Sequence, residues 1–286
     1  MKQMLGIVTL LVAVMAPAHS QSPEGTLKTI QQTKTIRLGY LQTAVPFSFA
    51  DDKKQPAGFT VDLCQRVANG IQQQLGLPSL EIKWVPITQE NRFDMVRNGS
   101  IDLECGTSTH TLSRQKTMDF SLTIWVDGAN FVVNPAVSNA RRLADLNGKR
   151  IAVIPGTTTE RAIAEISKRD FISVELVPVK DHLEGMNGLN DKKVDAYATD
   201  QAVLIGLAFA VRDQMRVLMG DQPFSYEPYG LVLRRGDPEF RLAVNTVIAR
   251  VLRSGQIMEI YDRWFGKLGK PSPLLVATWA TNGLPE

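Results

Sequence analysis

The stretch Asn98–His110 reads NGSIDLECGTSTH and joins a strand to a polar loop. Apolar and polar residues alternate over Ile101–Cys105, which predicts a short strand, and Gly99 ends a helix predicted over Asn91–Asn98. The glycine and hydroxyl residues that follow predict a polar loop over Gly106–Arg114. Binding sites in α/β sheets lie beyond the carboxyl ends of strands, so this loop is the first candidate for a site.

The same alternation of strands and helices extends toward the N-terminus. Strands are predicted at Ile36–Tyr40 and Leu80–Val85. Between them Thr60 is predicted to cap a helix that Gly76 stops. The apolar positions of this helix recur every four residues, at Leu63, Val67, Ile71 and Leu75. Downstream of the loop, Phe120–Val133 is predicted to be extended, with an interruption near Asp127.

A second run of alternating elements follows that extended stretch. Its predicted strands are Ile151–Ile154, Ser173–Val179, Val194–Ala198 and Gly230–Leu233. Its predicted helices are Glu160–Lys168, Asp181–Asn190, Asp200–Ala210, a helix from Asp237-Pro238 to Ser254, and Ile257–Phe265. The tail after Lys270 contains two prolines and is predicted to be irregular. Two such runs predict an α/β protein of two lobes, each a mixed, mainly parallel sheet with flanking helices.

The first twenty residues have the pattern of a secretory signal peptide. Lys2 precedes an apolar run, Met4–Val14, and small residues surround Pro17. The run is well short of the roughly 20 residues that a membrane-spanning helix needs, and a buried core helix is the alternative. We predict a leader over residues 1–20, removed on export to the periplasm.

The overall composition is that of a globular protein without a nucleic-acid-binding surface. Of the 286 residues, 44% are hydrophobic and 21% are charged, which excludes a disordered chain. The 32 Lys and Arg residues nearly balance the 29 Asp and Glu residues, and no basic block of five or more occurs.

Two cysteines, Cys64 and Cys105, belong to the exported part of the chain. A disulfide between them would suit an oxidising compartment. Two separately buried thiols are equally compatible with the sequence, because spacing alone does not show that the Cα atoms come within reach.

Three groups of polar residues follow predicted strands and could bind a small zwitterion. Thr107, Thr109 and Arg114 offer hydroxyls and a guanidinium to a carboxylate. The turn Pro155–Thr159 adds the N–H groups of a helix N-terminus, although a plain capping turn is the alternative. Asp200 is either the cap of its helix or an acceptor for an ammonium group. Together they are the polar complement of an α-amino acid.

Catalytic chemistry has little support in the sequence. The exported chain has two histidines, His110 and His182, no Gly-x-Ser-x-Gly element, and no cluster with zinc-ligand spacing. Asp102 and Glu104 alternate along one strand and could form a carboxylate pair. We expect one of them to form a structural ion pair and the other to face solvent or the cleft.

The order of short motifs along the chain resembles the family 3 extracellular solute-binding proteins of polar amino-acid ABC importers, closest to the glutamate/aspartate-binding branch. The stretches that carry the resemblance are Val45–Phe49, Gly58–Cys64, Pro86–Thr88 through Asn91-Arg92, Asn98–Gly106, Arg114–Lys116 before Asp119–Ser121, Asp145–Lys149, Gly156–Thr158, Lys180–His182, Tyr229-Gly230 and Trp264-Phe265. They cover nearly all of the exported chain.

The resemblance implies a two-lobed receptor that closes about a hinge of two segments, near 124–128 and 224–229. Lobe 1 would comprise residues 21–125 plus 226–286, and lobe 2 residues 126–225. The resemblance also implies the roles of several side chains. Arg114 would bind the ligand α-carboxylate, with help from Thr109, Thr157 and Thr158. Asp200 would bind the α-ammonium group, and Thr107 would line the pocket. Arg92 and His182 would face a carboxylate on the ligand's side chain.

Three positions depart from the acidic-amino-acid branch. That branch usually has an arginine where this chain has Leu41, a serine at Gln89 and an asparagine at His110. The loss of one cation weakens recognition of a second carboxylate, so glutamate or aspartate is expected narrowly over another polar amino acid.

The implied function is that of the periplasmic substrate-binding component of an amino-acid ABC importer, working with a permease in the inner membrane. We expect a monomer without cofactor, metal, nucleic acid or enzymatic activity. The alternatives are an enzyme on the same fold, such as a cyclohexadienyl dehydratase with Glu104 as its acid, and a soluble ligand sensor for a receptor.

Overall fold

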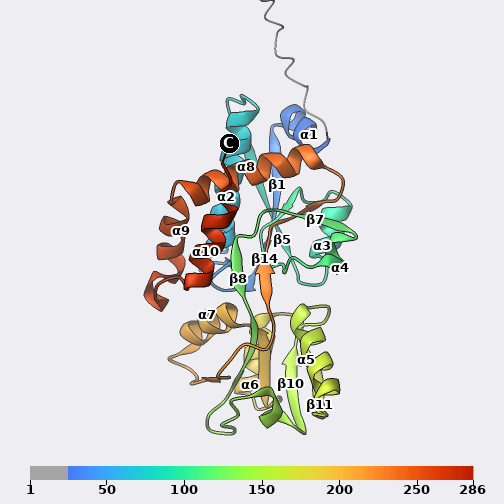
Figure 1. Cartoon of the computed structure of the whole chain (residues 1–286), viewed down its shortest axis with the longest axis vertical. Coiled ribbons are helices and arrows are strands. Elements are labelled where there is room, and N and C mark those ends of the chain that lie inside the picture. The colour runs from blue at the N-terminus through green and yellow to red at the C-terminus, as the bar shows by residue number, and fades with distance from the viewer. Residues whose placement is uncertain (1–24, 286) are drawn as a thin grey trace, which may run out of the picture.

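The computed structural model describes residues 25–285, and the predicted leader lies outside them. Figure 1 shows two lobes, one above the other, with two strands running between them. These strands are β8 (Trp125–Asp127) and β14 (Glu227–Tyr229), which pair antiparallel. The chain therefore passes from the upper lobe to the lower one along β8 and returns along β14.

The upper lobe is built on a mixed five-stranded sheet in the order β5-β1-β6-β15-β7. Its strands are β1 (Thr35–Leu41), β5 (Glu81–Ile87), β6 (Leu103–Glu104), β7 (Met118–Phe120) and β15 (Val232–Arg234). β1 runs parallel to β5 and β6, whereas β15 is antiparallel to β6 and β7. A small sheet beside it contains β2 (Thr43–Ala44), β3 (Ser48–Ala50) and β4 (Pro56–Ala57).

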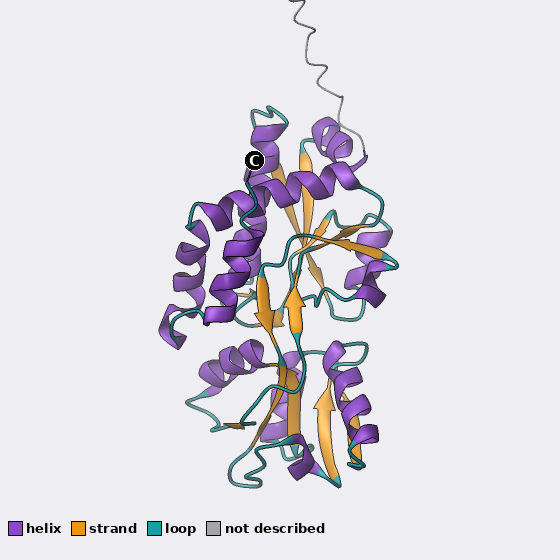
Figure 2. Ribbon diagram, viewed as in Figure 1, coloured by secondary structure: helices purple, strands orange, loops and turns teal. Residues whose placement is uncertain are grey.

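Helices cover this upper sheet, as Figure 2 shows. They are α1 (Gly25–Thr33), α2 (Phe59–Gln74), α3 (Arg92–Arg97), α4 (Leu112–Gln115), α8 (Pro238–Arg253), α9 (Gln256–Phe265) and α10 (Pro273–Asn282). α8 begins as predicted, because Asp237 Oδ1 accepts a hydrogen bond from Phe240 N.

The lower lobe repeats the design with a sheet in the order β11-β10-β12-β9-β13. Its strands are β9 (Ala129–Val133), β10 (Lys149–Val153), β11 (Val174–Pro178), β12 (Ala196–Asp200) and β13 (Leu218–Met219), and its α-helices are α5 (Thr158–Arg169), α6 (His182–Asn190) and α7 (Gln201–Val211). β10 is parallel to β11 and β12, and β9 is antiparallel to β12 and β13. The predicted α/β class with mixed sheets is confirmed.

The start of α2 differs from the prediction in one residue's role. Its cap is Gly58, not Thr60, and the Thr60 hydroxyl instead donates to Phe47 O and Cys105 O. Gly58 has a φ of 127°, and a Cβ there would lie 2.2 Å from Phe47 O. Only glycine fits this close approach of two backbones, and the Thr60 hydroxyl instead links the helix to Cys105, just after β6.

The C-terminal tail was wrongly predicted to be irregular. Pro273 is the first residue of α10, and the Ser272 hydroxyl caps that helix by accepting from Leu275 N. A proline at this position is compatible with a helix because its missing N–H has no partner there anyway. Trp279 anchors α10 to the residue that precedes the interlobe strand β8, through a 2.8 Å hydrogen bond from Nε1 to Ile124 O.

The two cysteines form a disulfide between Cys64 in α2 and Cys105 just after β6, with a Cα–Cα distance of 6.2 Å. The link resolves the alternatives that the sequence left open. It also fixes the start of the polar loop Gly106–Arg114 to the helix that packs behind it.

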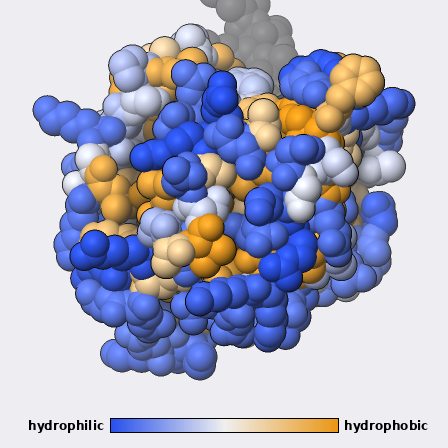
Figure 3. Space-filling view, turned by 90° about the horizontal axis from the view of Figure 1, so that it is seen from below, coloured by the Kyte–Doolittle hydropathy of each residue, from blue (hydrophilic) through white to orange (hydrophobic). Residues whose placement is uncertain are grey.

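The face of the molecule on the side of the lower lobe is mainly polar. Seen from below in Figure 3, hydrophilic side chains surround small groups of hydrophobic ones. Within residues 25–285, no helix combines the length and the apolar character that crossing a bilayer demands.

Candidate functional site

Four segments that follow strands meet between the lobes. The upper lobe contributes Leu41, at the end of β1, and Gly106–Thr109 after β6; the lower lobe contributes Pro155–Thr158 after β10 and Asp200 at the end of β12. The carboxyl ends of the parallel strands in both sheets therefore face the same cleft. Ligands of α/β sheets bind beyond such strand ends.

Two cavities open into this cleft, and residues of both lobes line each of them. A cavity of about 290 Å³ is lined by Phe93, Ser113, Arg114, Thr117, Gly156, Thr157, Thr158 and Arg161. A cavity of about 140 Å³ is lined by Leu41, Gln42, Thr43, Ile87, Thr88, Gln89, Glu90, Lys180, Asp181 and His182. Some of the predicted site residues line one of these two cavities, and the others are buried around them.

Arg114 is held rigidly at one opening. It lies in the short helix α4, which Thr111 caps, and its Nη1 donates to Thr109 O at 2.8 Å. Its guanidinium carbon lies 5.1 Å from the centre of the Phe93 ring. Burial, the largest cause, lowers the pKa of Arg114 to about 9, and the positive charge of Arg92 adds to the lowering. The guanidinium is therefore still charged at neutral pH and positioned for an anion.

The turn before α5 faces Arg114 from the lower lobe. Thr157 is the helix cap: its hydroxyl accepts from Glu160 N and donates to Ile154 O. Its side chain is thus occupied, and only its backbone N–H group remains for a ligand. Thr158 differs, because its hydroxyl lies 3.1 Å from the hydroxyl of Thr109 across the cleft. The Thr158 hydroxyl also donates to Glu227 Oε2 at 2.6 Å, so it accepts from Thr109. Thr157 therefore caps the helix, whereas the Thr158 hydroxyl reaches across the cleft.

Asp200 stands at the cap position of α7, yet its carboxylate does not cap the helix. Asp127 of β8 performs that task, since its Oδ2 accepts from Ala202 N at 2.9 Å. Asp200 Oδ2 accepts from the Tyr229 hydroxyl at 2.5 Å, while Oδ1 is buried without a partner. The sequence favoured a cap, and the structure instead leaves one carboxylate oxygen for another donor.

Arg92 is 3% exposed and lies at the start of α3. Its Nη1 donates to Gln89 Oε1, its guanidinium carbon lies 4.7 Å from the Phe93 ring centre, and its Nε has no hydrogen-bond partner. Burial lowers its pKa, and the negative charge of Glu104 opposes this. A buried guanidinium with an unused N–H is a donor that a ligand oxygen could satisfy.

His182 lies at the start of α6, on the opposite side of the cleft from Arg92. Its Nδ1 is 2.7 Å from the Tyr197 hydroxyl, and its Nε2 is buried without a partner. Burial lowers its pKa to about 4, so the ring is neutral at pH 7. It can offer a hydrogen bond but not a positive charge.

The remaining predicted pocket residues are buried or partly buried in the same region. Leu41 is 3% exposed and Thr107 is 5% exposed, and Gln89 accepts the hydrogen bond from Arg92. Leu41 lines the smaller cavity with an apolar surface where the resemblance leads one to expect a cation.

Asp102 and Glu104 have separate environments. Asp102 forms an ion pair with Arg37 at 2.7 Å, as expected of one member of the pair. Glu104 is fully buried rather than facing solvent, and neither of its oxygens has a hydrogen-bond partner of good geometry. Burial raises its pKa, whereas the charges of Arg92 and Arg114 lower it.

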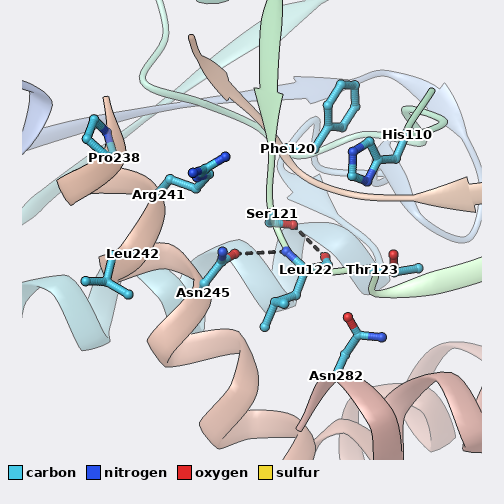
Figure 4. Close-up of a pocket in the computed structure, with 10 residues that line it drawn as sticks. All are labelled: His110, Phe120, Ser121, Leu122, Thr123, Pro238, Arg241, Leu242, Asn245 and Asn282. Atoms are coloured by element: carbon cyan, nitrogen blue, oxygen red, sulfur yellow. Dashed lines mark hydrogen bonds between the residues drawn. The ribbon is translucent and has the colours of Figure 1, made fainter. Parts of the chain in front are cut away.

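A larger cavity, of about 380 Å³, lies outside the cleft beside α8 (Figure 4). His110 stacks on Phe120 at one side of it, with 4.4 Å between ring centroids. Two of its polar groups are already used by the protein, because Asn245 Oδ1 accepts from Leu122 N and the Ser121 hydroxyl donates to Leu122 O. Among residues 25–285 no group of His, Cys, Asp and Glu side chains could hold a metal ion.

Sequence reasoning missed three residues that line the junction of the lobes. Asp127, Glu227 and Tyr229 come from the two interlobe strands and lie around Asp200. No local motif indicates a role for them at the site, because their proximity depends on strands about a hundred residues apart.

A family model, described as bacterial extracellular solute-binding proteins, family 3, matches residues 36–267. The L-glutamate/L-aspartate-binding protein of Pseudomonas aeruginosa is 32% identical over 90% of this chain and 86% of its own length. The glutamate/aspartate import solute-binding protein of Escherichia coli is 30% identical over 89% and 85%.

Solved structures share the two-lobed fold. An ancestral arginine-binding protein bound to glutamine aligns with a TM-score of 0.73 and 28% identity, over 82% of this chain and 98% of that one. An ancestral amino acid-binding protein, described as a precursor of cyclohexadienyl dehydratase, aligns with a TM-score of 0.72 and 28% identity, over 84% and 100%.

Proposed function

This chain belongs to family 3 of the bacterial extracellular solute-binding proteins, and we propose that its ligand is an α-amino acid with an acidic side chain, glutamate or aspartate. It is the amino-acid-binding component of an ABC importer and works with a membrane permease; it is not an enzyme. The periplasm is the compartment of this family. We further propose that the predicted leader is removed and that the protein acts as a monomer.

The observation that carries the ligand proposal is a set of buried polar atoms without partners in the cleft. They include Asp200 Oδ1, Arg92 Nε and His182 Nε2; both Glu104 oxygens and the Ser108 hydroxyl in the same region are also buried without partners. Buried polar atoms nearly always have hydrogen-bond partners, so this set favours a ligand that supplies them. An α-ammonium suits Asp200, and a side-chain carboxylate suits Arg92 and His182. Arg114 remains for the α-carboxylate.

Closure of the lobes follows from the same assignments. The ligand would touch Arg114 and Thr109 of the upper lobe and Asp200 and Thr158 of the lower lobe. A ligand with contacts on both sides stabilises the closed state over the open one. The strands β8 and β14 would act as the hinge, and only the closed form would dock productively on the permease.

A ligand panel tests the proposal directly. Protein stripped of bound ligand by unfolding and refolding is screened by thermal shift against the twenty amino acids. A ligand that binds only the folded state adds about 2.7 kcal/mol of apparent stability at a hundredfold excess over its Kd. We expect the largest shifts with glutamate and aspartate. Larger shifts with glutamine or asparagine would contradict the acidic preference, and no shift with any amino acid would contradict amino-acid binding.

Leu41→Arg should increase the affinity for glutamate and aspartate. The added cation would line the side-chain end of the cleft, and a buried charge-assisted hydrogen bond is worth about 1.5–3 kcal/mol, or roughly a tenfold to hundredfold change in Kd. The Leu41 side chain lies beside Gly106, and Glu104 Oε1 is adjacent. A partner for the new charge is therefore present within the wall.

Calorimetric titration of the Leu41→Arg variant with glutamate and glutamine measures this change. Leu41→Met is the matched control, because it keeps the volume and adds no charge. A folded Leu41→Arg protein whose glutamate affinity does not rise relative to glutamine would refute this assignment of the side-chain subsite.

A further inference from the structure

Three carboxylates from three separate elements meet where the interlobe strands join the lower lobe. Asp127 ends β8, Glu227 begins β14, and the two residues are directly paired in the antiparallel ladder. Asp200 lies at the junction of β12 and α7. The Tyr229 hydroxyl connects the group, at 2.5 Å from Asp200 Oδ2 and 3.5 Å from Asp127 Oδ2. Like charges opposite each other destabilise a ladder, so this arrangement needs a compensating cation or proton.

The hydrogen bonds that the cluster receives come from neutral donors. Asp127 accepts from Gly128 N and Ala202 N, both at 2.9 Å. Glu227 accepts from the hydroxyls of Ser225 and Thr158, both at 2.6 Å. The ion pairs found within residues 25–285 include none of the three carboxylates.

The charged groups that act on the cluster from neighbouring elements are two guanidiniums, Arg92 of α3 and Arg114 of α4. Neither lies within ion-pair distance of it. Asp200 Oδ1 has no partner at all, and Asp200 is only 7% exposed. This oxygen is the place in the cluster where a proton can sit and where an arriving cation can replace it.

We propose that the cluster of Asp127, Asp200 and Glu227 holds a proton while the cleft is empty, and that the α-ammonium of the ligand displaces this proton to solvent. The inference rests on the proposed function, since it needs an amino group at Asp200. Asp127 is a positioning residue: it caps α7 in place of Asp200, and its charge favours protonation of Asp200 in the empty cleft.

The electrostatics of the cluster agree with this geometry. Burial raises the pKa of Asp200 well above its usual value, and the charges of Glu227 and Asp127 raise it further. Burial is also the main cause that raises the pKa of Asp127 to about 7. An ammonium beside Asp200 favours the ionised form and so lowers these pKa values. Binding then releases a proton, and affinity falls as the pH falls, by up to about tenfold per pH unit for one proton.

Calorimetric titration near pH 7 in buffers of different ionisation enthalpy counts the released protons. L-glutamate is the probe, and L-glutamine is titrated in parallel because its neutral side chain does not alter the titration of His182. We expect release of about half to one proton per ligand, since the cluster shares its proton among coupled sites. Binding heats that are equal in all buffers for both ligands would overturn the inference.

Asp127→Asn tests the positioning role. It removes one like charge from beside Asp200, so we expect fewer released protons and a flatter dependence of affinity on pH. Glu227→Gln removes the other like charge and should also lower the number of released protons. This variant replaces Asp127→Asn as the test if Asp127→Asn does not fold. Asp213→Asn, an exposed position after α7, is the matched control and should release as many protons as the parent protein.

The outcomes separate the two claims. Binding without proton release overturns the inference and leaves the proposed function standing, whereas the absence of binding by any amino acid refutes both. Unchanged proton release in both Asp127→Asn and Glu227→Gln would refute the role of these neighbours.

Discussion

Arg114→Ala is expected to weaken the binding of every amino acid by at least about 30-fold. Arg114 is the partly buried cation at the cleft opening that both lobes line, and its guanidinium is oriented by Thr109 O and the Phe93 ring. Truncating one partner of a buried hydrogen-bonded charge pair costs 2–5 kcal/mol, or roughly a 30-fold to 5,000-fold loss of affinity. The loss should be general because every amino acid carries the α-carboxylate that Arg114 would hold.

Arg92→Ala is the informative comparison. Arg92 is even more buried, yet it lies toward the side-chain end of the cleft with Gln89. Its removal should weaken glutamate and aspartate far more than glutamine, so the preference changes while binding survives. Calorimetric titration of both variants with the same ligands gives the answer. Equal loss of all ligands in both variants would show that the two arginines do not have separate roles.

A control is needed for the general effect of removing a cation from this opening. Arg161 lines the same cavity as Arg114, and its side chain is half-exposed. Arg161→Ala should therefore leave affinity within a few-fold of the parent protein. A loss as large as that of Arg114→Ala would mean that overall positive charge, and not the placed guanidinium, holds the ligand.

Local patterns were sufficient to predict most elements. The periodicity of Leu63, Val67 and Ile71 predicted α2, and all three side chains are buried. Segments that follow strands supplied most of the site candidates, because the carboxyl ends of both sheets meet at the cleft. The helices α1 and α10 were missed, since a short polar helix and one that starts at a proline have weak local signals.

The details that decide chemistry depend on contacts between distant residues. Asp200 occupies the cap position of α7 in the sequence. The helix N–H group of Ala202 nevertheless donates to Asp127, which lies 73 residues earlier in the chain. The deep burial of Glu104 is also not encoded in its strand, where alternation with Asp102 gave two equivalent carboxylates. Long-range packing of this kind cannot be derived from the local sequence.

The disulfide is the second feature with a large expected effect. Cys64 and Cys105 are 41 residues apart, and a cross-link restricts the unfolded chain by closing that loop. In the chain-entropy description a loop of this length corresponds to about 4 kcal/mol. Replacing both cysteines by alanine should therefore lower the free energy of unfolding by about 4 kcal/mol, a large share of the roughly 5–15 kcal/mol typical of native proteins.

Chemical denaturation of the ligand-free double variant measures the loss. A single Cys64→Ala variant is the control, because it breaks the same bond while keeping one buried thiol, and it should lose nearly as much. The fold should survive, since α2 keeps its apolar contacts with α8 and α9 and Thr60 still binds Cys105 O. Amino-acid affinity should then fall only modestly. A stability loss below about 1 kcal/mol would contradict the entropic account, because the closed loop alone predicts several times more.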